Sequence, residues 1–220
     1  MATPGENYLR IRQSLAEDVA LVVAAKGRSV AEVAQVVEAG ATIIGQNYVQ
    51  EAQALRAELG EGAGRVELHM IGHLQRNKVR RALPLFDVIQ SVDSGRLARA
   101  VSQRASGVVR AYVEVNVGGE GSKYGVPPDD AEEFVRRMSE LGNIRIEGLM
   151  TMEPYSEDPE EARPYFRRMK ELFERLKGVE LPNVRMEVLS MGMTNSYRVA
   201  VEEGATMVRI GTAIFGPRPT

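Results

Sequence analysis

The sequence predicts a (β/α)8 barrel, because its length suits one and because two kinds of segment alternate along it. Short apolar runs of strand length recur through the 220 residues, and stretches with helical periodicity lie between them. The runs are residues 21–26, 41–46, 66–72, 87–92, 109–117, 144–152, 185–192 and 206–213. Strands that alternate with helices favour a parallel sheet, and eight such units in about this length favour a closed TIM-like barrel.

The segments between these runs read as amphipathic helices. A helix is expected around residues 6–20, before the first strand, and another at 31–40, where AEVAQVVEAG ends in glycine. Residues 159–178 predict a longer helix, whose apolar side chains recur at intervals of three and four. These side chains are Phe166, Met169, Leu172, Phe173 and Leu176. The chain therefore predicts a barrel with an extra helix at its N-terminus.

An open, doubly wound sheet is the competing architecture. It would bind a nucleotide through a glycine-rich turn after the first strand, and no G-x-G-x-x-G stands there. No linker or shift in composition divides the sequence. We therefore expect residues 1–220 to form a single barrel domain.

Composition excludes several function classes. The net charge of −2 and the pI of about 5.9 give no basic footprint for nucleic acid. No apolar run approaches the roughly 20 residues of a membrane span. With no cysteine and only two histidines, neither a disulfide framework nor a zinc site is expected. The N-terminus has no apolar signal core, so a cytoplasmic protein is expected, and no apolar stripe calls for a partner, so we expect a monomer.

In such a barrel the chemistry gathers where strands end and the following loops begin. Nearly every unit of this sequence delivers a polar residue or a glycine to that position. These residues are Lys26, Gln46, Asn47, Gly72, His73, Gln90, Ser91, Asn116, Met152, Glu153, Ser190 to Gly192 and Arg209 to Thr212. The sequence therefore predicts a functional site at the carboxyl end of the barrel.

Among the five lysines, Lys26 alone terminates an apolar strand, in LVVAAKGRS. Lys170 and Lys177 belong to the solvated face of a helix, Lys78 begins another helix, and Lys123 lies in a loop where it is either exposed or close to a ligand phosphate. Lys26 is either a lysine whose head reaches solvent or a desolvated amine. Burial favours the free amine, which attacks a carbonyl carbon to form a Schiff base.

Two segments near the C-terminus predict a phosphate site. Residues 190–196 and 209–216 follow the seventh and eighth strands, and their small residues either allow tight turns or leave backbone N–H groups for a phosphate. Thr212 adds a hydroxyl. Arg209 is expected to point into the barrel, either to an internal ion pair with Glu114 or Glu147 or as a donor to a ligand. His69, in mid-strand, is expected to be a core histidine.

Together these segments resemble the pyridoxal phosphate homeostasis protein family. The resemblance rests on "AAKGRS", "IIGQNYVQEA", "LHMIGHLQRNK", "VEVNVGGEGSKYGV", "LSMGMTNSYRVAVEEGA" and "TMVRIGTAIFG", in order from about residue 6 to 218. It implies the barrel of the alanine racemase N-terminal domain type, with pyridoxal 5′-phosphate (PLP) in Schiff-base linkage to a lysine. The residues that it implies for the cofactor are Lys26, Asn47, Ser190, Met191, Gly192, Arg209, Gly211 and Thr212.

By this resemblance, Lys26 forms the linkage, Arg209 faces the pyridine nitrogen, Asn47 lies beside the ring and the others hold the phosphate. The chain departs from the family pattern at four places. Gln46 stands where the family usually has Glu, Gly27 where it has Thr, and Leu68 where it has an aromatic residue. Residues 194–196 replace a segment that often contains Asp.

The predicted chemistry is binding rather than catalysis. A guanidinium has no acceptor for a proton on the pyridine nitrogen, and an unprotonated ring is a weak electron sink. Alanine racemase adds a second base from a further domain, and this sequence ends just past the eighth unit. We therefore expect a non-catalytic carrier or buffer in PLP homeostasis, with apo PLP-dependent enzymes as candidate recipients. A weak amino-acid racemase and a Schiff-base aldolase acting on a phosphorylated sugar are the alternatives.

Overall fold

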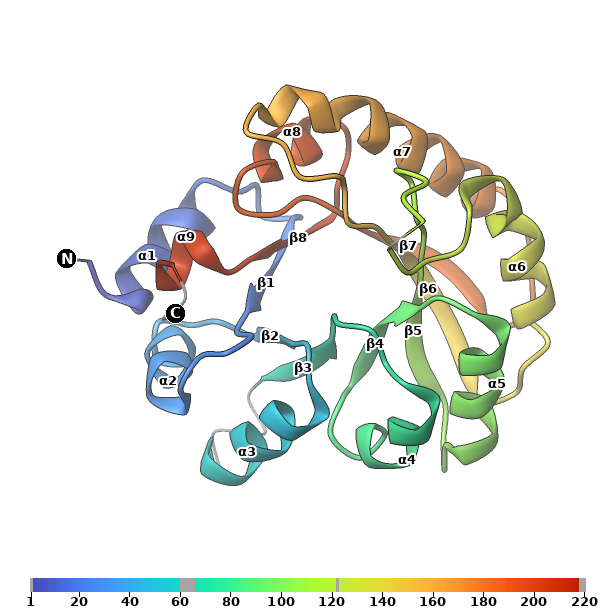
Figure 1. Ribbon diagram of the computed structural model, residues 1–220, viewed down its shortest axis with the longest axis horizontal. Coiled ribbons are helices and arrows are strands. Elements are labelled where there is room, and N and C mark those ends of the chain that lie inside the picture. The colour runs from blue at the N-terminus through green and yellow to red at the C-terminus, as the bar shows by residue number, and fades with distance from the viewer. Residues whose placement is uncertain (1, 60–65, 122, 218–220) are drawn as a thin grey trace.

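The strands form a closed parallel barrel (Figure 1). The structure, a computed structural model, describes residues 2–59, 66–121 and 123–217. Around the ring the order is β1 (Ala20–Ala24), β2 (Ile43–Gln46), β3 (Glu67–Met70), β4 (Val88–Val92), β5 (Val109–Glu114), β6 (Ile144–Met150), β7 (Val184–Ser190) and β8 (Met207–Ile210). The predicted barrel is confirmed, and the open doubly wound sheet is excluded because β1 pairs with β8.

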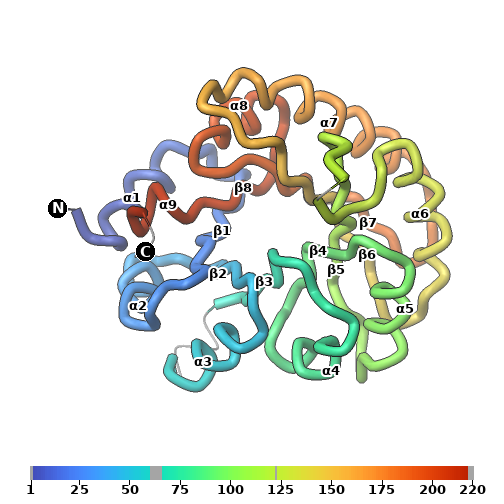
Figure 2. Tube along the Cα trace, viewed as in Figure 1, coloured from blue at the N-terminus to red at the C-terminus, as the bar shows by residue number. Residues whose placement is uncertain are grey.

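Helices cover the outside of the barrel (Figures 1 and 2). They are α1 (Pro4–Gln13), α2 (Val30–Glu38), α3 (Val49–Leu59), α4 (Val79–Ala82), α5 (Gly95–Arg104), α6 (Ala131–Met138), α7 (Arg163–Lys177), α8 (Tyr197–Glu202) and α9 (Thr212–Phe215). Short 3-10 turns precede three of them, η2 (Arg76–Lys78), η3 (Pro128–Asp130) and η4 (Pro159–Ala162). The expected N-terminal helix is α1, which begins at a capping box of Thr3 and Glu6 and ends earlier than expected.

Six of the eight strands end before the apolar runs do, and only β2 and β4 reach the last residue of their runs. β1 ends at Ala24, so Lys26 lies in the turn that follows it, and β5 ends at Glu114. Asn116 therefore does not continue the strand face of Tyr112 and Glu114. Its Nδ2 instead donates to the carbonyl oxygens of Glu120 and Lys123, which organises the next loop. Apolar residues such as Ala25 and Val115 thus continue past the strands into the loops around the carboxyl end.

Two apolar layers hold the fold together. The predicted apolar stripe of α7 is buried against the outside of the barrel, together with most of the core. A smaller cluster fills the barrel interior: Val22, Ile71, Val88, Tyr112, Met150 and Met207. The interior is therefore packed with side chains, and a ligand has room at an end of the barrel rather than along its axis.

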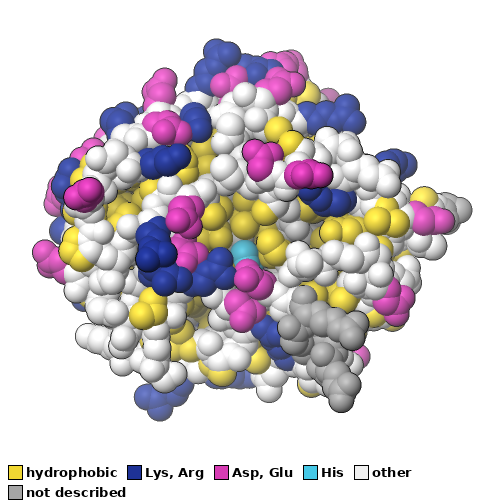
Figure 3. Space-filling view, turned by 180° about the vertical axis from the view of Figure 1, so that it is seen from behind, with side chains coloured by type: hydrophobic (Ala, Val, Ile, Leu, Met, Phe, Trp, Pro, Cys, Tyr) yellow, Lys and Arg dark blue, Asp and Glu magenta, His cyan; other side chains and the backbone are white. Residues whose placement is uncertain are grey.

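Charged side chains close the amino end of the barrel interior. Arg110 bonds to Glu147 at 2.7 Å and to Glu67 at 3.0 Å, while Arg145 lies 2.7 Å from Glu147. The carboxylate of Glu147 is thus committed to Arg110 and Arg145, so the expected ion pair between Arg209 and Glu147 does not form. Figure 3 shows, at the centre of the face seen from behind, acidic and basic side chains and one histidine around an apolar hollow.

Within the described residues, no helix is long and apolar enough to cross a membrane. In the same part of the chain, no group of three or more His, Cys, Asp or Glu side chains is arranged to hold a metal ion. The site is therefore built from the other polar residues and the glycines.

Candidate functional site

A cavity of about 720 Å³ opens at the carboxyl end of the barrel. Five of the eight predicted cofactor residues line it: Lys26, Asn47, Arg209, Gly211 and Thr212. They come from the loops after β1, β2 and β8 and from β8 itself. The closed barrel thus brings together residues that are almost 190 positions apart in the sequence.

Lys26 supplies the primary amine of the cavity. It lies in the tight turn after β1, half-buried, and its Nζ is 5.3 Å from the centre of the Tyr48 ring. An ammonium over an aromatic face is a favourable contact, and here it keeps the lysine head near the cavity. Lys26 is therefore placed to meet a carbonyl group inside the cavity.

Glycines at the ends of β7 and β8 let the backbone pack closely against neighbouring parts of the protein. Gly192 has φ of +90°, and a Cβ there would lie 2.5 Å from Cβ of Ala200. A Cβ on Gly211 would lie 2.8 Å from the carbonyl oxygen of Ala24. Gly211 also precedes α9, and the first backbone N–H groups of a helix have no partner within it. The backbone of Gly211 and the hydroxyl of Thr212 line the cavity, where they suit an anion such as a phosphate.

Ser190 and Met191 are fully buried, and their polar groups are engaged within the protein. The hydroxyl of Ser190 bonds to Arg209 and Gln90, and the N–H of Met191 donates to the carbonyl oxygen of Met207. The structure therefore brings both residues next to the cavity wall without directing these groups at a ligand. Their predicted role in holding a phosphate stays a prediction.

Arg209 is a buried cation that lines the cavity. Its side chain donates to Oγ of Ser190 at 2.8 Å and to the carbonyl oxygen of Thr151 at 2.6 Å. Burial lowers the pKa of this guanidinium, while the charges of Glu153 and Glu114 act in the opposite direction. A guanidinium carries five N–H groups, so two hydrogen bonds leave others for an acceptor on a ligand.

Two loops form the roof of the cavity, one after β6 and one after β7. Nδ2 of Asn195 donates to the carbonyl oxygens of Ser156 and Glu157, at 2.9 and 3.1 Å. Ser196 bonds through its hydroxyl to the buried carboxylate of Glu153. These contacts explain the segment 194–196, whose role the sequence left open, because each polar side chain ties neighbouring loops together.

Sequence reasoning missed the contacts of Thr194 and the interior position of Gln90. Oγ1 of Thr194 accepts from the N–H of Ala213 at 3.2 Å and so links the loops after β7 and β8. Gln90 is fully buried inside the barrel and does not reach the rim. Its place in a short strand flanked by Val88, Ile89 and Val92 was the available signal, since a buried amide needs hydrogen-bond partners.

The two histidines lie away from the cavity lining. His69 is buried and bonded to Gln90 and Glu67, so the expected core histidine is confirmed. His73 bonds to Asp93 at 2.8 Å and stacks on the ring of Tyr124, with ring centres 3.6 Å apart. Both imidazoles are thus held by protein contacts.

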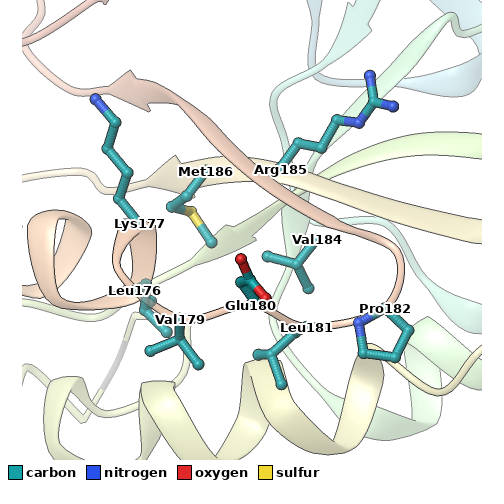
Figure 4. A pocket seen from close by; sticks show the side chains of 9 residues that line it. All are labelled: Leu176, Lys177, Val179, Glu180, Leu181, Pro182, Val184, Arg185 and Met186. Carbon is teal, nitrogen blue, oxygen red and sulfur yellow. The ribbon is translucent and has the colours of Figure 1, made fainter.

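A second pocket, of about 450 Å³, lies at the amino end of β7, beside the end of α7 (Figure 4). In Figure 4 the charged ends of Lys177 and Arg185 point away from each other, and Glu180 lies between apolar side chains. Its polar groups do not converge on one point, so it has no feature of a specific binding site.

Comparison with known proteins places the chain in a family. A family model described as "Alanine racemase, N-terminal domain" matches residues 5–219. A pyridoxal phosphate homeostasis protein of Aquifex aeolicus is 43% identical over 182 residues, which cover 81% of this chain and 78% of that protein. The chain belongs to the pyridoxal phosphate homeostasis protein family. The predicted resemblance is thereby confirmed.

Solved structures of a family member share the fold. PipY of Synechococcus elongatus, in a structure without PLP, superposes with a TM-score of 0.90 at 32% identity, over 97% of this chain and 100% of that chain. A structure of PipY with PLP bound gives a TM-score of 0.88 at 31% identity. Alanine racemase of Clostridium difficile, at 17% identity and a TM-score of 0.76, shares the barrel fold alone.

The residues of this chain fit PLP as a ligand. Lys26 provides an amine for an aldehyde, and the backbone of Gly211 and the hydroxyl of Thr212 line the same cavity, where they suit a phosphate. Arg209 provides N–H donors in a buried position, which suit the lone pair of a pyridine nitrogen. Each chemical group of PLP thus has a counterpart among the residues of the cavity and its walls.

Proposed function

We propose that this chain holds PLP covalently and reversibly on Lys26 and takes part in intracellular PLP homeostasis as a carrier or buffer. The observation that carries the proposal is the convergence of Lys26, Arg209 and Gly211 on one cavity. The PLP-bound structure of the relative PipY supports the same ligand. Membership of the pyridoxal phosphate homeostasis protein family supports the biological role.

Each residue has a distinct part in binding. PLP supplies an aldehyde, which condenses reversibly with a primary amine. Lys26 Nζ is that amine, and Tyr48 keeps it near the cavity. The phosphate is held by the backbone at Gly192 and Gly211 and by the hydroxyl of Thr212. The buried residues Ser190 and Met191 position the backbone at Gly192. Arg209 donates a hydrogen bond to the ring nitrogen, and Asn47 lies beside the ring.

We further propose that the chain is not a catalyst. Arg209 can only donate, so it stabilises a pyridine nitrogen that carries no proton and leaves the ring a weak electron sink. A racemase also needs a second acid or base across the ring from Lys26. No histidine is among the described residues that line the cavity, and the one tyrosine there, Tyr155, is 87% exposed. Solvent deuterium entering the α-carbon of an added amino acid faster than with free PLP would contradict this proposal.

The wider setting follows from the same proposal. A carrier of PLP meets its recipients, apo PLP-dependent enzymes, in the cytoplasm, and the cavity is complete within one chain, so a monomer suffices. Sedimentation equilibrium of the purified chain with and without PLP tests the monomer.

The deciding experiment compares PLP binding by the wild type, Lys26→Ala and Lys123→Ala. Lys123 is the matched control, because it is a lysine at the same end of the barrel whose Nζ bonds to the carbonyl oxygen of Glu153. Borohydride reduction followed by peptide mass spectrometry is expected to find PLP on Lys26 in the wild type and in Lys123→Ala. Lys26→Ala is expected to lose both the adduct and the visible absorbance.

Two results would overturn the proposal. Binding of PLP by Lys26→Ala with the spectrum of the wild type would place the linkage elsewhere. A colourless wild type that borohydride reduces only in the presence of a phosphorylated sugar would instead indicate a Schiff-base aldolase.

A further inference from the structure

A chain of hydrogen bonds crosses the barrel interior from Arg209 to the opposite side. Nη1 of Arg209 donates to Oγ of Ser190 at 2.8 Å, and this hydroxyl lies 2.8 Å from Oε1 of Gln90. Nε2 of Gln90 lies 2.7 Å from Nδ1 of His69, whose Nε2 lies 3.1 Å from Oε2 of Glu67. The chain runs from β8 and β7 to β4 and β3, which face each other across the ring of strands.

The direction of every bond follows from the chemistry at one end. Arg209 can only donate, so the hydroxyl of Ser190 accepts from it and gives its own proton to Oε1 of Gln90. The amide of Gln90 then presents Nε2–H to Nδ1 of His69, which must accept. The proton of a neutral His69 is therefore on Nε2, where it donates to Glu67.

Glu67, at the other end of the hydrogen-bond chain, requires the same direction of donation. The carboxylate of Glu67 can only accept, so Nε2 of His69 carries a proton. Burial lowers the pKa of His69 and favours the neutral ring, which leaves Nδ1 without a proton. All four bonds thus point the same way, with a cation at the start and a carboxylate at the end, an arrangement in which hydrogen bonds polarise one another.

This chain of hydrogen bonds has its main effect on Arg209, whose side chain is buried, with the residue 4% exposed. Among the described residues, no carboxylate lies within 4.0 Å of its guanidinium. A buried charge without a direct partner is costly unless dipoles are oriented toward it. The hydroxyl of Ser190, oriented by Gln90 and His69, provides such a dipole.

We propose that Gln90 and His69 are positioning residues for the cofactor. They hold the guanidinium of Arg209 in place opposite the ring nitrogen and keep it charged. This inference rests on the proposed function, because it takes PLP to be the ligand and Arg209 to face its nitrogen. The two side chains do not touch the ligand. Their effect on Arg209 passes through Ser190. Glu67 is the last acceptor of this chain of hydrogen bonds.

The test compares PLP with an analogue in which C–H replaces the ring nitrogen, in the wild type and in Gln90→Met. Methionine keeps the volume of glutamine beside Met207, whose Sδ lies 3.3 Å from Nε2 of Gln90, but it cannot relay a hydrogen bond. The affinity of Gln90→Met for PLP is expected to fall about tenfold, the effect of losing one buried hydrogen bond. Its affinity for the analogue is expected to equal that of the wild type.

Two further variants keep the test decisive. Glu67→Gln changes the far end of the chain, at a side chain that is 46% exposed, and is expected to weaken PLP binding about threefold without affecting the analogue. Tyr112→Phe is the control, since the buried hydroxyl of Tyr112 has no hydrogen-bond partner in the described structure, and it is expected to bind both ligands as the wild type does.

The outcomes separate this inference from the proposed function. A wild type that does not bind PLP contradicts both. If the wild type binds PLP, the inference alone is wrong when the folded variants lose affinity equally for PLP and for the analogue, which is a structural effect. It is also wrong when neither Gln90→Met nor Glu67→Gln changes the affinity for PLP.

Discussion

Glu114 is the residue whose buried position has the clearest consequence for stability. It ends β5 inside the barrel, 5% exposed, and its Oε2 has no hydrogen-bond partner in the described structure. Burial, with a smaller effect from Asp93, raises the pKa of this carboxyl to about 7, and Arg209 opposes the rise. A carboxyl with this pKa is mostly protonated below neutral pH and carries a buried negative charge above it.

The raised pKa of Glu114 predicts that the folded state loses stability as the pH increases. Below the model value of 4.5 the carboxyl is neutral in both the folded and unfolded states. Between 4.5 and about 7 the folded state alone keeps its proton, so the free energy of unfolding falls with pH and then levels off. The loss is of the order of 3 kcal/mol. Glu114→Gln is expected to remove this loss.

Urea unfolding of the apo protein at pH 5 and pH 8 measures the effect of Glu114. Other titrating groups contribute equally to the wild type and to the variant, so the difference between the two proteins isolates this carboxyl. The stability of Glu114→Gln relative to the wild type is expected to be higher at pH 8 than at pH 5. An identical difference at both pH values would show that Glu114 titrates normally.

At the scale of secondary-structure elements, Asn195 provides the exposed link between the two roof loops, beside the buried bond of Ser196 to Glu153. Asn195 donates to the backbone of Ser156 and Glu157, so the loop after β7 is tied to the loop after β6 across the cavity. Both acceptors are carbonyl oxygens, and the amide is exposed. Such bonds contribute modestly to stability, but they have to open when a ligand leaves by way of the roof.

Asn195→Ala is therefore expected to release PLP faster, by about threefold to tenfold, the effect of one or two exposed hydrogen bonds. The dissociation rate is measured by stopped-flow absorbance after mixing the loaded protein with excess scavenging amine. Glu157→Ala is the matched control, because it removes a side chain from the roof loop after β6 and leaves the backbone acceptor of Asn195 in place. Equal rates for all three proteins would show that the loops do not limit release.

The elements themselves were largely predictable, because an alternation of apolar runs with amphipathic helices reports burial directly. Each predicted run contains or overlaps one observed strand, and the apolar stripe of α7 is buried as predicted. The ends of strands were less predictable, because apolar loop residues such as Ala25 and Val115 follow the strands directly. Strand ends depend on where the hydrogen-bond ladder stops, which neighbouring strands decide.

The members of the site were predictable and their contacts were not. A lysine after a strand and glycines after the last two strands are visible in the sequence, and the barrel rule places them at one end. Ser190, by contrast, bonds to Gln90 and Arg209, which are 100 and 19 positions away. Such partners depend on the register of facing strands, and no local pattern reports it.

At the scale of the whole molecule, the first and last parts of the chain close the barrel together. β1 pairs with β8 from Ala20 opposite Met207 to Val23 opposite Ile210. Nδ2 of Asn7 in α1 donates to the carbonyl oxygen of Ile214 in α9 at 2.9 Å, and Figure 2 shows these two helices side by side. The cavity lies at this seam, so its residues come into place only when the ring is closed.

This closure predicts one cooperative unfolding transition that PLP shifts as a whole. A ligand at one hundred times its Kd stabilises the folded state by about 2.7 kcal/mol, which raises the Tm of a chain of this length by about 5 to 10 °C. Calorimetry of the wild type with PLP is expected to show this shift, and a smaller one with pyridoxine 5′-phosphate, which has no aldehyde for Lys26. Lys26→Ala is expected to respond equally to both compounds. Two separate transitions, of which PLP shifts only one, would mean that the seam between β1 and β8 opens independently of the rest of the barrel.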